Sequence, residues 1–165
     1  KWNGTFTVAT TFPAGGKYKL FADFVPKGGA ATTISEWVNV EGPAKGHAEV
    51  KADSSLVKVV DGKEVALDLS SKKASGDVTL AFTIRDAQTG QPISDLEPYL
   101  GAVGHVVILS ADAERYIHVH PSDETATGPK AQFSASFPQS GTYKMWGQFQ
   151  HRGNVFTVPF TVEIQ

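Results

Sequence analysis

The sequence predicts an all-β protein, and more narrowly an immunoglobulin-like antiparallel β-sandwich preceded by a partial copy of the same repeat. The composition is the first indication: the 165 residues include 16 Gly, 9 Pro, 10 Phe and 3 Trp, which is typical of short strands joined by turns. Helical periodicity is nearly absent from the chain. Short stretches of apolar–polar alternation recur between turn-forming residues, as in sandwich domains.

Seven or eight strands are expected within residues 53–165. Each candidate combines β-branched or aromatic residues with alternation and is bounded by Gly, Pro, Asp or Ser. The candidates are SLVKVVDG (55–62), EVALDLS (64–70), DVTLAFTIRD (77–86), GHVVILS (104–110), RYIHVHP (115–121), AQFSASFP (131–138), TYKMWGQFQ (142–150) and NVFTVPFTVEI (154–164). The segment ISDLEPYLG (93–101) offers at most one short helical turn, because Pro92 and Pro98 prevent a longer helix.

An internal repeat relates two parts of the chain. Residues 12–29 (FPAGGKYKLFADFVPKGG) align without gaps with residues 137–154 (FPQSGTYKMWGQFQHRGN), and seven positions are identical. The stretches ISEWVNVEG and FTVPFTVEI continue the similarity as two alternating segments that suit a final strand. Convergence of two hairpins on one turn chemistry is the alternative, but the shared register favours duplication.

The repeat predicts the domain organisation. Only KWNGTFTVAT stands before the first copy, whereas a long run of strands precedes the second. We therefore expect residues 1–42 to form a partial, three-stranded immunoglobulin-like repeat, residues 43–52 a linker, and residues 53–165 a complete sandwich. Because one apolar face requires a partner layer, we expect chain upstream of Lys1, the second domain, self-association or an envelope protein partner to cover the partial repeat.

Both copies carry the pattern of a tyrosine corner. SGTYKM (140–145) and GGKYKL (15–20) have the Gly-x-Tyr-x-apolar spacing in which the phenol bonds back to the backbone at the start of a strand. An ordinary strand tyrosine is the alternative reading of Tyr143 and Tyr18. The corner predicts that Met145 is a core residue rather than a metal ligand.

Charge and composition exclude several classes of function. The formal net charge is −2 and no Lys/Arg block occurs, so we expect no binding to nucleic acid or anionic membranes. No apolar run approaches the ~18 residues of a membrane span. The chain has no cysteine, which excludes disulfides, thiolate metal sites and thiol catalysis. Any metal would be held by His, carboxylate or Met side chains.

Three of the five histidines lie in one expected hairpin, GHVVILSADAERYIHVHP (104–121). If Ser110 pairs with Arg115 across a four-residue loop, His105 lies opposite His120 and Val107 lies opposite His118. All three imidazoles then project from one side of the sheet, because directly paired residues share a face. A three- or five-residue loop, or a bulge, would move His105 to the other face.

Such a cluster could supply a three-histidine metal site at His105, His118 and His120, with copper favoured over zinc by the general order of affinities. The alternative is three solvated or singly hydrogen-bonded histidines on a structural or protein-interaction module. On the non-core face the cluster would neighbour Trp146 and Gln148. His47 and His151 are weaker candidates, which we expect to be exposed loop residues.

The segments DLEPYLGAVGHVVILSADAERYIHVHP and ASFPQSGTYKMWGQFQHRGNVFTVPFTVEI give the chain a resemblance to bacterial secreted or periplasmic immunoglobulin-like proteins of YtkA-like or FixH-like character. It covers residues 77–164 and is strongest at Leu-Glu-Pro-Tyr-Leu-Gly, Gly-His and His-Val-His-Pro. The resemblance implies a periplasmic or extracellular location, association with heavy-metal handling or membrane oxidase systems, and a metal role for the three histidines.

No catalytic motif accompanies these features. The sequence contains no serine-nucleophile elbow, phosphate-binding loop, dinucleotide fingerprint or HExxH helix. A three-histidine metal with an open position could support hydrolysis, but no general base stands near it in the sequence. We therefore expect a non-enzymatic domain.

Overall fold

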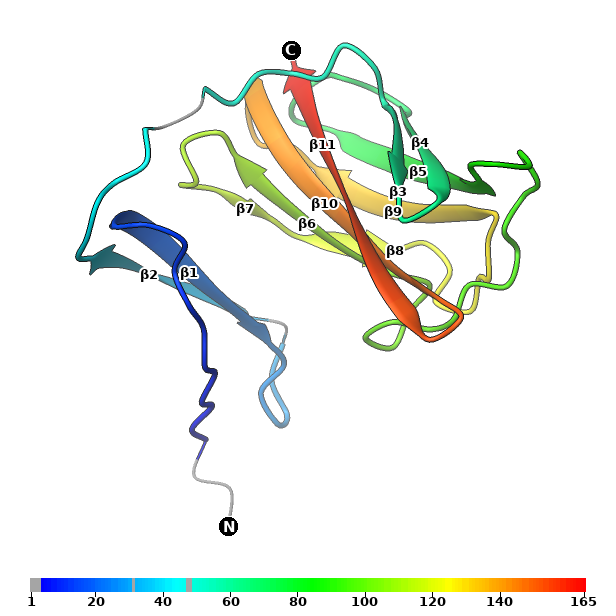
Figure 1. Cartoon of the computed structure of the whole chain (residues 1–165). Helices are drawn as coiled ribbons and strands as arrows, with labels where there is room; N and C mark the ends of the chain where they lie inside the picture. Colours follow the sequence, from blue (N-terminus) through cyan, green and yellow to red (C-terminus); the bar gives the residue numbers. More distant parts are fainter. Residues whose placement is uncertain (1–3, 31, 47–48) are drawn as a thin grey trace. The chain divides into compact units, whose positions relative to one another are not determined.

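The computed structural model describes residues 4–30, 32–46 and 49–165. The chain divides into two compact units, Lys1–Glu49 and Val50–Gln165 (Figure 1). The described residues form strands, bridges and turns but no helix, and therefore no helix that could span a membrane. The predicted all-β, antiparallel class is confirmed. The immunoglobulin-like subclass and the domain boundaries at residues 42 and 52 stay predictions.

The second unit consists of two antiparallel sheets (Figure 1). The five-stranded sheet has the order β3 (Val57–Val60), β4 (Lys63–Leu69), β5 (Asp77–Asp86), β9 (Lys130–Ser136) and β8 (Val119–Pro121). The four-stranded sheet has the order β11 (Asn154–Ile164), β10 (Gly141–His151), β6 (His105–Ser110) and β7 (Tyr116–Ile117). Every stretch expected to be a strand contains one, and RYIHVHP is divided between β7 and β8.

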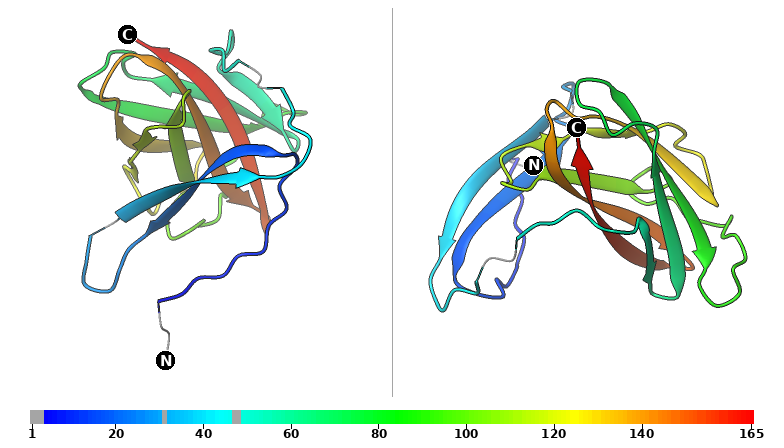
Figure 2. Two further views of the ribbon diagram at one scale, coloured as in Figure 1. Left: turned by 90° about the vertical axis from the view of Figure 1, so that its left-hand side faces the viewer. Right: turned by 90° about the horizontal axis from the view of Figure 1, so that it is seen from above.

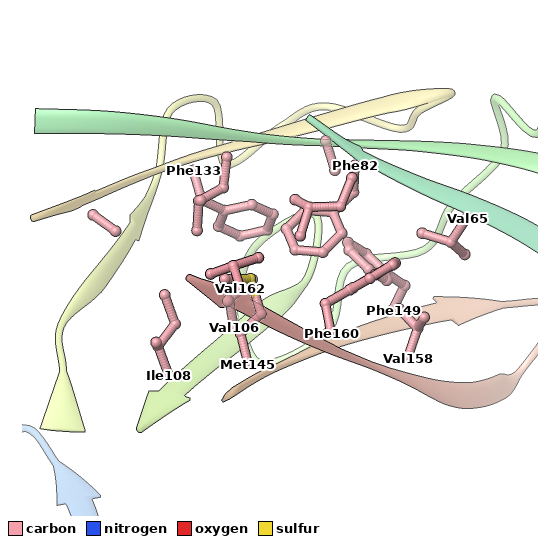
Figure 3. Packing of buried hydrophobic residues seen from close by; sticks show 14 of the residues in the cluster. Val65, Phe82, Val106, Ile108, Phe133, Met145, Phe149, Val158, Phe160 and Val162 are labelled. Carbon is pink, nitrogen blue, oxygen red and sulfur yellow. The ribbon is translucent and has the colours of Figure 1, made fainter. Parts of the chain in front are cut away.

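The core lies between these two sheets (Figure 3). Phe82 of β5 is at its centre, with its ring 5.8 Å from that of Phe133, 5.3 Å from Phe149 and 6.2 Å from Phe160. Along β10 every second residue is buried, as strand alternation requires. Met145 is fully buried, so its predicted core position is confirmed.

The first unit contains one described sheet, the hairpin of β1 (Gly16–Phe24) and β2 (Thr32–Val40), which is drawn in blue and cyan in Figure 2. The expected third strand is not formed, because residues 4–12 have no strand structure. Phe6 and Val8 in this stretch are each 84% exposed. A strand here would place these apolar side chains on a sheet with no second layer within the described part of this unit.

The tyrosine corner is confirmed in both repeats. The hydroxyl of Tyr143 donates to the carbonyl oxygen of Gln139 at 3.0 Å, and the hydroxyl of Tyr18 donates to that of Ala14 at 2.9 Å. Each tyrosine also contacts the Phe of its Phe-Pro lead-in: ring centroids are 4.9 Å apart for Phe137 and Tyr143, and 4.7 Å for the pair in the first unit. The repeat therefore specifies the same local structure twice.

Candidate functional site

The loop between β6 and β7 has the register that the sequence predicted. The amide of Ser110 donates to the carbonyl of Arg115 at 3.0 Å, and Leu109 lies opposite Tyr116. Asp112 fixes the loop, because its carboxylate accepts hydrogen bonds from the Ser110 hydroxyl and from the backbone amide of Glu114. These two contacts, the hydroxyl first, lower the pKa of Asp112 below its usual value.

The pairing of this hairpin ends earlier than expected. Strand β7 stops at Ile117, and after His118 the chain enters β8, which belongs to the other sheet. There His120 lies opposite Ser134 of β9. The predicted pairs of His105 with His120 and of Val107 with His118 are therefore wrong, although the loop register from which we derived them is right.

Packing explains the change of sheet. Ile117 is buried opposite Ile108 of β6, and two residues later Val119 packs against the core opposite the buried Ala135 of β9. Both apolar side chains thereby contribute to the edge of the core from different sheets. His118 lies between these two residues in the chain and His120 follows them. Both histidine side chains point outward and are exposed.

The structure brings two of the three predicted ligands together. The ring centroids of His118 and His120 are 5.4 Å apart and the rings are nearly perpendicular, at 83°. The ring of Tyr116 lies 6.0 Å from that of His118. Two exposed imidazoles and one phenol therefore line up along the connection between the two sheets.

His105 lies elsewhere on the four-stranded sheet. It is the first residue of β6, is half-buried, and stands opposite Gln148 of β10, the neighbour expected for it. In the described part of the chain, no three or more His, Asp or Glu residues form a group that could hold a metal ion. The metal role of His105, His118 and His120 stays a prediction, and His47 lies outside the described residues.

His151 is not the exposed loop residue that we expected. It is the last residue of β10 and only 8% exposed, and its Nε2 atom lies 3.0 Å from Oδ1 of Asp95. The reason is the alternation of β10, which continues inward from Tyr143 through Phe149 to His151. Extending the strand by one residue beyond its predicted end would have revealed this.

A second carboxylate fixes the same end of the β10–β11 hairpin. Oε2 of Glu97 accepts a hydrogen bond from the Gln150 side chain at 2.7 Å and one from the backbone amide of Gly153 at 3.0 Å. Glu97 and Asp95 come from the segment between β5 and β6, where the sequence shows only a proline-bounded turn. The Glu97 contacts attach this segment to the sheet. The Asp95 carboxylate of the same segment contacts His151.

Comparison with known proteins identifies a family. Residues 58–165 match the family described as Domain of unknown function (DUF8832). The chain belongs to this family. No curated protein and no solved structure matches the chain. The YtkA-like or FixH-like resemblance therefore stays a prediction.

Except for Val57, the first residue of β3, the DUF8832 segment contains both sheets of the second unit and all of the site. It includes His105, His118 and His120 as well as the buried His151. The hairpin of β1 and β2 lies outside the match, although it has the register and the tyrosine corner of β10 and β11.

Proposed function

We propose that the DUF8832 domain of this chain is an exported, non-enzymatic binding domain that holds a transition-metal ion, copper in preference to zinc, at His118 and His120. The observation that carries the proposal is the 5.4 Å separation of the two exposed rings. Imidazoles this close can direct two nitrogen atoms at one ion, and no burial opposes the entry of the ion.

The number of ligands favours copper. Structural zinc sites are almost always closed by four protein ligands. Cu²⁺ binds more tightly than Zn²⁺ to the same nitrogen and oxygen ligands and accepts tetragonal sites with water or partner donors in the remaining positions. A two-histidine site on the surface fits this second description.

Export and the lack of enzymatic activity complete the proposal. The resemblance to secreted and periplasmic proteins supports export. The sequence contains none of the common catalytic motifs, and the buried His151 is engaged by Asp95 rather than by a serine or another nucleophile. Binding, rather than turnover, is therefore the function proposed for the histidines.

Thermal unfolding in the presence of metal tests the site. A ligand that binds only the folded state stabilises it by about 2.7 kcal/mol at a concentration 100 times its Kd. We expect Cu²⁺ to raise the Tm of the wild type, with a smaller rise for Zn²⁺ and reversal by a chelator. His118→Ala and His120→Ala should each abolish most of the shift.

The variant His105→Ala serves as the matched histidine control and should retain the shift. If it loses the shift as fully as the other two variants, the originally predicted three-histidine set is the better description. If metal well above micromolar concentration leaves the wild-type Tm unchanged, the metal proposal fails. The alternative, a structural or protein-interaction module of the cell envelope, would then be preferred.

A further inference from the structure

The hairpin of β1 and β2 has one largely apolar face and one mixed face. Residues paired directly across the hairpin share a face. The other face is mixed: it carries Lys17, Lys19 and Asn39 together with the rings of Phe21 and Trp37, which lie beneath the lysine ammonium groups. The apolar face comprises Tyr18, Leu20, Ala22, Phe24, Ile34, Val38 and Val40, interrupted by Glu36.

The apolar face matches the core face of β10 and β11 pair by pair. Tyr18 lies opposite Val38 as Tyr143 lies opposite Val162. The next pairs on this face are Leu20–Glu36 against Met145–Phe160, Ala22–Ile34 against Gly147–Val158, and Phe24–Thr32 against Phe149–Phe156. The two hairpins thus present equivalent faces, with one charged exception.

Burial distinguishes the apolar face of β1 and β2 from the core face of β10 and β11. In the second unit Met145, Val158 and Phe160 are 0% exposed. At the equivalent positions of the first unit, Leu20 is 46% exposed and Ile34 is 58% exposed. Among the described residues of the first unit, a face with the pattern of a sandwich core therefore has no covering layer.

The covering layer of the second unit shows what such a face accepts. Phe82 of β5 contacts Phe149 and Phe160, and Phe133 of β9 contacts Phe149 at 6.3 Å. The apolar side of that sheet is already filled, since Phe82 and Phe133 are at most 1% exposed. It cannot cover a second hairpin.

Glu36, the charged exception, would favour a positive charge on the layer that covers this face. Glu36 stands where the second unit has Phe160. The Nζ atom of Lys58, on β3 of the covering sheet, lies 5.4 Å from the centroid of the Phe160 ring. A covering sheet with a lysine at the same position would place an ammonium group beside the Glu36 carboxylate.

We propose that the apolar face of β1 and β2 is the docking surface for a five-stranded sheet of the same family, contributed by a further segment of the natural polypeptide. This sheet has the order of β3-β4-β5-β9-β8, presents Phe and Leu side chains to Leu20 and Ile34, and carries a cation opposite Glu36. The first unit is then the closing hairpin of a second DUF8832-type sandwich.

Hydrogen exchange on the natural polypeptide and on residues 1–165 tests the proposal. Covering a hairpin converts locally opening amides into amides that exchange through global unfolding. We expect the β1 and β2 amides to exchange at least about 100-fold more slowly in the natural polypeptide, approaching the rates of β10 and β11. Equal rates in the two polypeptides would overturn the proposal.

Paired variants identify the face and the occupant. In the natural polypeptide Ile34→Lys should lower the Tm of the proposed sandwich that β1 and β2 close. Ser35→Lys, on the opposite face, should leave this Tm nearly unchanged. Equal effects would contradict the assignment of the face. Light scattering can also show that residues 1–165 form a dimer. If Ile34→Lys abolishes that dimer, the occupant is a second copy and the proposal is wrong.

A hairpin exchange within the full chain tests the fit directly. Residues 137–164 are replaced by a copy of residues 12–40, which sets Glu36 beside Lys58. Cooperative unfolding of this chimera, with a Tm that falls further on Lys58→Ala than in the wild type, supports both the sheet and its charge. If only a chimera that also carries Glu36→Phe folds, the sheet is supported without the charge. If neither folds, the face does not accept this sheet.

Discussion

At the scale of single residues, Tyr143 makes a polar contact from within the core. Its ring is 1% exposed and its hydroxyl donates to the carbonyl of Gln139. Tyr143→Phe keeps the ring and removes the hydrogen bond, so we expect the free energy of unfolding to fall by about 1 kcal/mol. Urea denaturation measures this change. Tyr18→Phe is the matched control in the first unit and should leave the main transition unchanged.

Asp112 should make the stability of the β6–β7 loop depend on pH. Its pKa in the folded protein is lowered by the Ser110 hydroxyl and the Glu114 amide. Its contribution is therefore present above the unfolded pKa of about 3.9 and is lost as the pH falls through the lower folded value.

We accordingly expect Asp112→Ala to reduce the free energy of unfolding at neutral pH, with the difference from the wild type shrinking below about pH 3.9. Chemical denaturation from pH 7 to pH 3 checks this. Because the side chain is largely exposed, the effect should be small. A difference that grows as the pH falls would refute the assignment.

At the scale of strands and sheets, Asp53 joins the two sheets of the second unit. Its Oδ2 atom accepts a hydrogen bond from the Thr161 amide of β11 at 2.7 Å and lies 2.7 Å from Nζ of Lys58 on β3. Asp53→Ala should lower the free energy of unfolding by about 2 kcal/mol, because a charge-assisted bond is lost and the backbone amide of the mostly buried Thr161 loses its acceptor.

Urea midpoints measure the effect of Asp53→Ala, and hydrogen exchange should locate the loosening at β3. Asp68→Ala removes an exposed carboxylate from the neighbouring β4 and serves as the control. If the two variants are equally stable, Asp53 does not link the sheets energetically.

At the scale of the whole molecule, we expect the first and second units to differ in stability. The second unit contains the hydrophobic core cluster and spans the DUF8832 match. Calorimetry of residues 50–165 should therefore show a cooperative transition within a few degrees of the main transition of residues 1–165. A loss of cooperativity on removing residues 1–49 would show that the second unit depends on the first.

Local chemistry made the strands and corners predictable. Alternation and turn residues located the strands of the second unit, and the Gly-x-Tyr spacing located both corners, because these features depend on neighbours in the chain. The register of the 111–114 loop was predictable for the same reason. His151 was missed because one further residue of β10 decides whether that side chain points inward.

The sequence by itself determined the β class, the repeat and the pairing beside the 111–114 loop, since these follow from short-range patterns. Tertiary structure decided that the chain changes sheets at His118. That step depends on β9, which comes later in the chain and pairs with Val119 and His120. It separated His105 from the other two histidines, and local pattern could not reveal it, because the competing partner lies outside the hairpin.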